Sequence, residues 1–132
     1  MKKRYIIAAA VLLAAGCTNK EKLAETTANG FLEAYLANEY EKAAEFCNEE
    51  LGSKFMEATA DFSSLDPSVR ELIVAECEKY GAEVTGVMQV NKSDTVEVQY
   101  QIYKKADSLS FERGKVTGYL KIVGGKITKL GQ

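Results

Sequence analysis

The stretch TVEVQYQIYK, residues 95–104, decides the fold class because its side chains alternate with a period of two. One side carries Val96, Val98, Tyr100 and Ile102, and the other carries Glu97, Gln99, Gln101 and Tyr103. Successive side chains of a β-strand point to opposite faces of the sheet. The stretch is therefore expected to be a strand with one apolar face and one mostly polar face.

Weaker alternations on both sides of this stretch predict further strands. Residues 84–90 come before it, and residues 91–94 are expected to form the connecting turn. Residues 108–123 follow; they are long for one strand and contain two glycines, which indicates a bend or a bulge. Gly124-Gly125 is typical of a hairpin turn before a last strand at 126–130. We therefore expect about four antiparallel strands.

The residues before this region show the helical spacing of apolar side chains. They predict four helices, at about residues 23–37, 40–47 and 50–59 and from Asp66 onward. For the fourth helix, Asp66 is expected to be the N-cap, Pro67 the first helical residue and Gly81 the left-handed C′ residue. Because helices come first and strands second, the sequence predicts an α+β domain with N-terminal helices packed on a curved antiparallel sheet.

The first residues are typical of an export signal. Lys2, Lys3 and Arg4 precede an apolar stretch at 6–15. As a helix this stretch would span only ~15 Å, half of a ~30 Å hydrocarbon core, so it suits a signal peptide better than a membrane span. The stretch runs into Leu13-Ala14-Ala15-Gly16-Cys17, which resembles the lipobox of bacterial lipoproteins. The alternative is an ordinary secretory signal that ends near a cysteine.

The lipobox resemblance implies a domain order and a location. Residues 1–16 are the expected lipoprotein signal peptide, 17–22 the lipidated Cys17 and a polar tether, and 23–132 a single domain. Two or more acyl chains hold a protein stably on a membrane, so the domain needs no membrane-binding face of its own. Thr18 is not the aspartate that resembles an inner-membrane retention signal. We expect the cell envelope, at the outer membrane facing the periplasm.

The charge balance excludes one class of partner. Removing Lys2, Lys3 and Arg4 from the 17 basic residues leaves 14 against 19 acidic ones, so the mature chain has a net charge of about −5. Binding to nucleic acid or to anionic lipid headgroups needs clustered Lys and Arg. We therefore expect no nucleic-acid partner, and membrane contact only through the lipid on Cys17.

Two cysteines remain besides Cys17, and each lies on an apolar helical stripe. Cys47 follows Tyr40 at helical spacing, and Cys77 follows Ile73. The expected compartment permits disulfides, so a Cys47–Cys77 bridge is one interpretation. The other interpretation is two buried free thiols that behave as small hydrophobic residues.

The order of elements resembles a known superfamily. A lipoprotein signal precedes FLEAYLANEYEKAAEFCNEEL at 31–51, further helices, and a run of strands that ends in LKIVGGKITKLG at 120–131. This pattern is similar to the nuclear transport factor two-like (cystatin-like) superfamily, and within it to the lumazine-binding-like lipoprotein domains of unknown function. The resemblance implies a cone, in which a curved sheet wraps on helices and encloses a pocket at its wide end. Relatives with this fold differ in activity, so the fold alone selects no function.

The composition excludes several kinds of catalysis. The chain contains no histidine, so it has no Ser-His-Asp or Cys-His nucleophilic site, and it lacks the commonest zinc ligand. It also has no Cys-x-x-Cys, dinucleotide fingerprint or P-loop, so neither a metal nor a cofactor is expected. One enzymatic alternative stays open, an isomerase- or dehydratase-like site with a carboxylate base and tyrosine hydroxyls. Asp61 and Asp66, near the junction of the third and fourth helices, could approach the mouth of the expected cone and provide this carboxylate. The alternatives are that Asp61 is a solvated loop residue and that Asp66 is a helix cap.

Aromatic side chains provide two candidate binding sites. Phe31, Tyr35 and Tyr100 are candidates for the lining of an apolar pocket, and the alternative is that they form core. Tyr103 and Tyr119 interrupt the polar face of the sheet and are candidates for a partner face. The alternative for these two is cross-strand pairing on a solvated sheet.

These observations predict a non-catalytic accessory or binding domain that contacts a protein partner or a second copy of itself. A small apolar ligand-binding lipoprotein is the first alternative, and the carboxylate and tyrosine enzyme is the second. The interior of the expected cone distinguishes these hypotheses, because an open aromatic interior favours a ligand and a filled one favours the sheet face.

Overall fold

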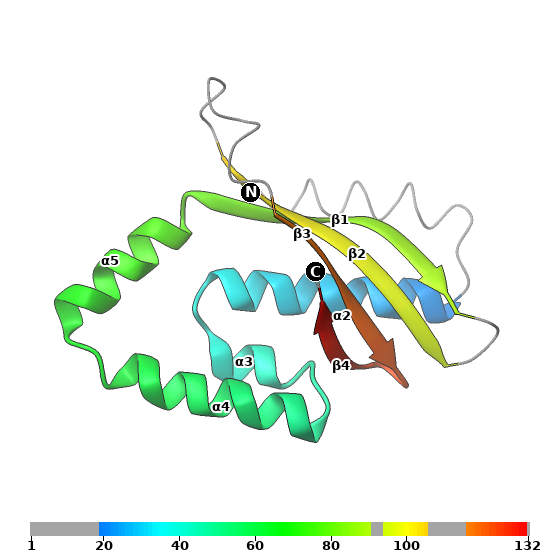
Figure 1. The fold of residues 1–132 in the computed structure, drawn as a ribbon, viewed down its shortest axis with the longest axis horizontal. Helices are drawn as coiled ribbons and strands as arrows, with labels where there is room; N and C mark the ends of the chain where they lie inside the picture. The colour runs from blue at the N-terminus through cyan, green and yellow to red at the C-terminus, as the bar shows by residue number, and fades with distance from the viewer. Residues whose placement is uncertain (1–18, 91–93, 106–115, 132) are drawn as a thin grey trace.

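The computed structural model describes residues 19–90, 94–105 and 116–131. Four helices precede four antiparallel strands, which confirms the predicted α+β class (Figure 1). The expected signal peptide, Cys17, most of the turn at 91–94 and the first part of the strand expected at 108–123 lie outside the described residues. None of the helices in the described part of the chain is long and apolar enough to cross a membrane.

The helices are α2 (Asn19–Leu36), α3 (Tyr40–Ala44), α4 (Glu49–Ser63) and α5 (Pro67–Cys77). The end of α2 at Leu36 is followed by a left-handed residue, Asn38, with φ of 62°. The N–H of Glu39 donates to the carbonyl of Ala34 at 2.9 Å, and the N–H of Asn38 donates to that of Tyr35 at 3.2 Å. These two hydrogen bonds form the Schellman pattern, which terminates a helix. The break between the helices predicted at 23–37 and 40–47 therefore has a defined geometry.

Of the residues expected to form a tether, those from Asn19 onward are helical. Helix α2 begins at Asn19, four residues before the expected start. The Lys20 ammonium lies 2.9 Å from the Asp94 carboxylate, and the Glu21 carboxylate accepts the backbone N–H of Gln89 at 3.1 Å. These contacts hold the first turn of α2 beside the β1–β2 connection, so the predicted boundary at residue 23 was wrong.

The strands are β1 (Tyr80–Gln89), β2 (Thr95–Lys104), β3 (Val116–Val123) and β4 (Lys126–Gly131). They pair antiparallel in the order β1-β2-β3-β4, so each strand lies beside its neighbour in the chain. Strand β2 has the bounds that the alternation predicted. Gly124 and Gly125 have φ of 57° and 84°, as a two-residue hairpin turn with two left-handed positions requires.

The core lies between α2 and the inner face of the sheet. Helix α2 contributes Ala24, Ala28, Phe31 and Leu32, and the sheet contributes Val96, Val98, Leu120 and Ile122, all at most 2% exposed. These sheet residues belong to the rows expected to face inward. The apolar face assigned from the period of two is therefore the buried face.

The connection between α3 and α4 extends the sheet beyond β4. The N–H of Asn48 donates to the carbonyl of Ile127 at 2.9 Å, and the N–H of Ile127 donates to that of Phe46 at 2.8 Å. Cys47 lies between these bonds and bridges Ile127 in parallel fashion. Cys47 was expected at a helical position, but it lies three residues beyond α3.

Helix α5 leads away from the sheet and returns the chain to β1 (Figure 1). Pro67 is its first residue, as predicted, and Asp66 precedes it without a side-chain capping hydrogen bond. The C-cap is Glu78, and Gly81 lies inside β1, so the assignment of Gly81 to the helix end was wrong. A Cβ on Gly81 would lie 2.8 Å from the Tyr103 hydroxyl, so packing of this ring explains the glycine.

Candidate apolar binding site

Helix α5 presents an apolar stripe that it does not bury. Val69, Ile73 and Cys77 are spaced by four residues and therefore lie on one side of the helix. The Cys77 sulfur lies 3.9 Å from Asn38 Oδ1, so this side faces the junction of α2 and α3. No residue of α5 is buried, and Val69 is 39% exposed. The stripe thus faces the rest of the molecule across open space.

Five aromatic rings from α2, α3 and α4 form what we call the aromatic cluster, namely Phe31, Tyr35, Tyr40, Phe55 and Phe62. Tyr35 stacks on Phe31 with centroids 5.8 Å apart and meets Phe55 edge-on at 6.2 Å. Tyr40 lies 6.1 Å from Tyr35 and 6.1 Å from Phe62. Ring pairs at these separations attract each other, so the cluster is a preformed aromatic surface.

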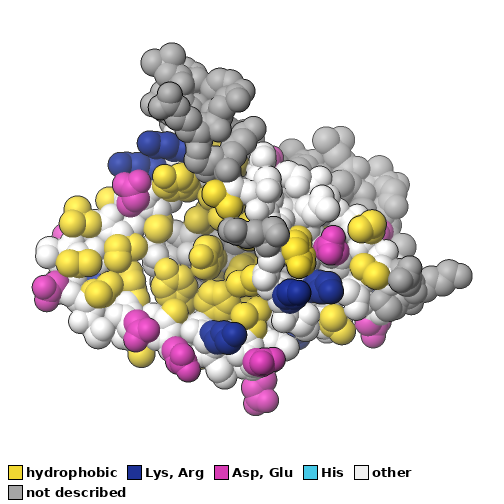
Figure 2. Space-filling view, viewed as in Figure 1, with side chains coloured by type: hydrophobic (Ala, Val, Ile, Leu, Met, Phe, Trp, Pro, Cys, Tyr) yellow, Lys and Arg dark blue, Asp and Glu magenta, His cyan; other side chains and the backbone are white. Residues whose placement is uncertain are grey.

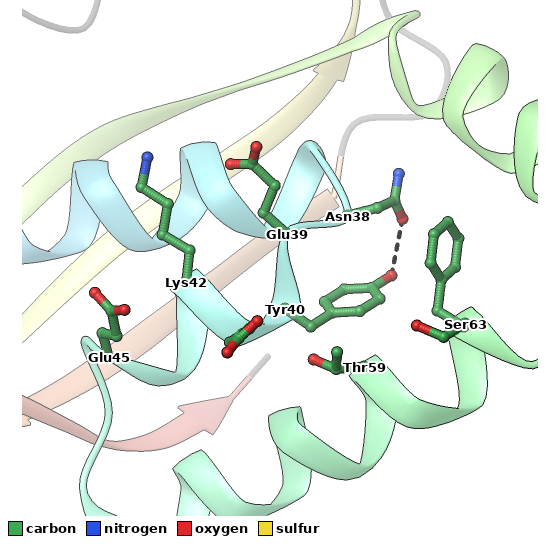
Figure 3. A pocket seen from close by; sticks show the side chains of 9 residues that line it. Asn38, Glu39, Tyr40, Lys42, Glu45, Thr59 and Ser63 are labelled. Atoms are coloured by element: carbon green, nitrogen blue, oxygen red, sulfur yellow. Dashed lines mark hydrogen bonds between the residues drawn. The ribbon is translucent and has the colours of Figure 1, made fainter.

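Hydrophobic side chains gather in a hollow framed by α4, α5, the end of α2 and the start of β1 (Figures 1 and 2). We call this space the hollow. One cleft of about 500 Å³ is lined by Tyr40, Thr59 and Phe62 together with charged residues of α3 (Figure 3). A second cleft of about 180 Å³ is lined by Leu36, Cys77 and Tyr103 together with other apolar residues and with charged residues of α2, α5 and the end of β2. Small-molecule sites commonly have volumes of about 300–1,000 Å³, so the larger cleft is of suitable size.

Asn38 fixes the position of Tyr40 at the wall of the hollow. The Tyr40 hydroxyl donates to Asn38 Oδ1 at 2.9 Å, and Nδ2 points away from Tyr40 (Figure 3). The Cys77 thiol approaches the same Oδ1, so two donors converge on this acceptor. Nδ2 is buried and has no hydrogen-bond partner among the described residues. Burial raises the pKa of Tyr40, and nearby Tyr35 and Cys77 raise it further.

Tyr100 joins this group from the inner face of the sheet. It pairs with Gly118 on β3, and a Cβ on Gly118 would lie 2.6 Å from its hydroxyl, so the ring lies over the glycine. Burial raises the pKa of Tyr100, and Tyr35 raises it further. Tyr40 and Tyr100 therefore keep their protons at neutral pH and present neutral hydroxyl groups.

The structure places the three predicted pocket residues in one region, in different roles. Tyr35 is 39% exposed and its ring lies 6.1 Å from that of Tyr40, which lines the larger cleft. Tyr100 is half-buried and packs against the core, and it lines neither of the two clefts. Phe31 is only 2% exposed and supports Tyr35 from beneath, so it belongs to the core rather than to the lining. Phe62 was missed because the third helix was expected to end at about residue 59, whereas α4 continues to Ser63. Its spacing of seven residues from Phe55 is two helical turns and could have revealed it.

The two residues of the candidate partner face, Tyr103 and Tyr119, pack on glycines of neighbouring strands. Tyr103 and Tyr119 both lie on the outer face of the sheet, but four positions apart along the register, or about 13 Å. The Tyr103 ring lies over Gly81, and the Tyr119 ring contacts the position that a Cβ on Gly131 would occupy. Both rings are therefore partly covered by neighbouring strands.

Cys47 and Cys77 are both free thiols. Cys47 is buried beside Ile127, and Cys77 lies at the end of α5 next to Asn38. Burial raises the pKa of Cys47 to about 11, so this thiol is protonated and unreactive at neutral pH. Of the two interpretations of these cysteines, the structure agrees with the free thiols.

The carboxylates at the larger cleft are those of Glu39, Glu41 and Glu45. Asp61 and Asp66 are exposed. Burial raises the pKa of Glu25, which is 2% exposed, but Glu25 precedes Tyr35 by ten residues, or ~15 Å along α2. Within the described ranges, no cluster of three or more His, Cys, Asp or Glu side chains is arranged to hold a metal ion.

The protein is an α+β domain with a hollow between α4, α5, the end of α2 and the start of β1, on the face that Figure 2 shows. Comparisons with protein-family models, curated proteins and solved structures find no match to the chain. The arguments for function therefore come from the geometry of this molecule alone.

Proposed function

We propose that the protein is a lipid-anchored, non-catalytic binding domain of the bacterial cell envelope and that it holds an apolar ligand in the hollow. One observation carries this proposal. Helix α5 turns the stripe of Val69, Ile73 and Cys77 towards the aromatic cluster but buries none of its residues. An apolar surface that faces a second apolar surface across open space gains free energy when a third apolar body fills the gap.

The size of this gain is sufficient for binding. A ligand with two aromatic rings that loses about 200 Å² of apolar surface gains about 5 kcal/mol from burial, before the entropy cost of association. Contacts between its rings and the aromatic cluster add about 0.5–1.5 kcal/mol per pair. The burial of apolar surface is therefore the largest contribution to the binding free energy, and the affinity is expected to depend mainly on the apolar area of the ligand.

A protein partner or second copy at the outer sheet face receives less support. Its candidate residues, Tyr103 and Tyr119, already lie over Gly81 and Gly131 of neighbouring strands. Such cross-strand contacts stabilise the sheet itself. We therefore assign binding to the hollow.

The hollow lies at the C-terminal end of α2, and Asn19, the first described residue, lies at the other end of this helix. The helix begins at Asn19, directly after the lipobox region, and its 18 residues span ~27 Å. Its first turn contacts Asp94 and Gln89 at the β1–β2 end of the sheet, whereas Tyr35 in its last turn belongs to the aromatic cluster. A lipid on Cys17 therefore presents the hollow towards the aqueous side and away from the bilayer.

Replacing Cys17 with Ser tests the anchor. The change removes the sulfur that carries the lipid, so the protein is expected to move from the membrane fraction to the soluble fraction and to lose incorporation of radiolabelled palmitate. Replacing Cys77 with Ser is the matched control, because it changes another thiol and is expected to leave both readouts unchanged. Palmitate labelling of Cys17→Ser at the level of the unaltered protein would contradict the anchor.

Replacing Ile73 with Glu tests the hollow as the binding site. A carboxylate on the stripe has to be desolvated when an apolar molecule enters, at a cost of several kcal/mol. We expect the affinity for the fluorescent probe N-phenyl-1-naphthylamine to fall at least about tenfold. The control is Leu72→Glu on the neighbouring, 70% exposed position of the same helix, which is expected to keep its affinity. Equal affinities of the two variants would contradict binding in the hollow.

A further inference from the structure

We propose that the end of the domain where α2 begins and β3 turns into β4 lies in the headgroup region of a phospholipid bilayer and inserts Leu23, Met88 and Val123 among the lipids. We call this end of the domain the anchor end. The inference rests on the lipid anchor of the proposed function. It goes beyond that function because it gives the protein a membrane contact of its own besides the lipid on Cys17.

Segments that are distant in the sequence meet at the anchor end (Figure 1). Leu23 of α2, Asp94 just before β2 and Gly124-Gly125 between β3 and β4 line one cleft of about 210 Å³. Leu23 is 66% exposed, Val123 beside the turn is 40% exposed, and Met88 near the end of β1 is 55% exposed. The anchor end therefore carries three large apolar side chains on its surface.

The short chain between the lipid and α2 brings this end to the membrane. Helix α2 begins at Asn19, two residues after Cys17. A fully extended chain covers at most ~3.6 Å per residue, so a lipid on Cys17 holds Asn19 within ~7 Å of the lipidated residue. The headgroup layer on each side of a bilayer is itself about 5–7 Å thick. The anchor end is therefore held at the headgroups for as long as the lipid is inserted.

The polar groups at the anchor end are already paired, which lowers the cost of bringing them to the lipid. The Lys20 ammonium lies 2.9 Å from the Asp94 carboxylate, and the Glu21 carboxylate accepts the backbone N–H of Gln89 at 3.1 Å. Removing water from paired groups costs less free energy than removing it from unpaired ones. Lys22 is exposed, and its long side chain lets the ammonium reach the headgroup phosphates while its methylene groups stay on apolar surface.

Contact at the anchor end fixes the orientation of the domain. A lipid is a single attachment point and leaves the domain free to turn about it. The three apolar side chains come from α2, β1 and β3, so their insertion at three separate points aligns the domain with the bilayer. The lipid thus supplies most of the membrane affinity, and the anchor end keeps the hollow on the aqueous side.

Single-tryptophan variants test this contact, because the chain contains no tryptophan of its own. The lipidated protein is reconstituted into phosphatidylcholine vesicles with and without brominated acyl chains, which quench tryptophan fluorescence on contact. Leu23→Trp and Val123→Trp are expected to lose most of their fluorescence in the brominated vesicles and to emit at shorter wavelength than in the unlipidated protein. The matched control is Leu72→Trp on α5, because Leu72 is 70% exposed and Leu23 is 66% exposed. This control is expected to keep its intensity and its wavelength.

Unquenched emission at either Leu23→Trp or Val123→Trp, or equal quenching of Leu72→Trp, overturns the inference. Flotation of the same vesicles shows separately whether the protein is anchored. Protein that floats with the vesicles but is not quenched at the anchor end leaves the proposed anchor standing. Protein that does not float overturns the anchor and the inference with it, so the two failures are distinguishable.

Discussion

Replacing Phe31 with Ala is expected to lower the free energy of unfolding by about 3–5 kcal/mol, the usual cost of truncating a fully buried Phe. Phe31 is 2% exposed and stands where the sheet-facing side of α2 meets the aromatic cluster. Its ring stacks on Tyr35 at 5.8 Å and meets Phe55 edge-on at 5.4 Å. Truncation therefore leaves a cavity beneath the hollow and removes two ring contacts.

Urea denaturation followed by circular dichroism measures this loss. Domains of this size are stable by only about 5–15 kcal/mol, so the variant is expected to be close to unfolding without denaturant. Leu23→Ala on the same helix is the control, because Leu23 is 66% exposed and its truncation is expected to change stability by no more than about 0.5 kcal/mol. Similar denaturation midpoints for the two variants would contradict the assignment of Phe31 to the core.

Replacing Gly118 with Ala is expected to destabilise the protein by about 2–3 kcal/mol through overpacking. An ideal Cβ at this position would lie 2.6 Å from the Tyr100 hydroxyl and 2.7 Å from the backbone oxygen of Gly131. The ring of Tyr100 can turn away, but the backbone of β4 can move only by distorting its pairing with β3. The change therefore disturbs the sheet and also displaces the Tyr100 ring.

Thermal denaturation gives the result as a lowered melting temperature, by about 10–20 °C for a domain of roughly 100 residues. Gly86→Ala is the matched control inside β1, where the nearest atom is the flexible Gln99 side-chain oxygen at 3.2 Å. We expect only a small shift for this control. A melting temperature of Gly118→Ala equal to that of Gly86→Ala would show that the sheet can accommodate the methyl group.

The sheet was predictable because its signals are local. The period of two at residues 95–104 gave both the bounds of β2 and its buried face, and Gly124-Gly125 gave the last turn through two left-handed positions. The predictions were wrong where contacts between residues distant in the sequence determine the ends of the elements. Helix α2 starts early because Lys20 and Glu21 contact the far side of the β1–β2 connection. Gly81 belongs to β1 because the Tyr103 ring covers it.

The candidate site was predictable in part. Tyr35 and Tyr100 lie on the inward sides of their helix and strand, which the periodicities of 3.6 and 2 identify. Periodicity cannot separate an apolar stripe that is packed from one that faces open space, and α5 is the case in point. The stripe of Val69, Ile73 and Cys77 is typical of a buried helix, yet α5 buries no residue. Only the position of α5 relative to α4 and β1 creates the hollow.

The polar contacts of Asn38 in the wall of the hollow could not be predicted from the sequence either. Asn38 was identified as a break between helices, but its left-handed φ of 62° also places Oδ1 within reach of the Tyr40 hydroxyl and the Cys77 thiol. Residues 38, 40 and 77 meet only after α5 has folded back towards the end of α2. The sequence spacing of 39 residues between Asn38 and Cys77 carries no signal for that contact.

The most direct test of binding in the hollow is a nuclear Overhauser experiment on the protein saturated with N-phenyl-1-naphthylamine. We predict cross-peaks from the probe to the ring protons of Tyr40 and Phe62, which line the larger cleft, and to the methyl groups of Ile73 on the stripe of α5. Cross-peaks confined to Tyr119 would place the binding surface on the outer face of the sheet and contradict the account.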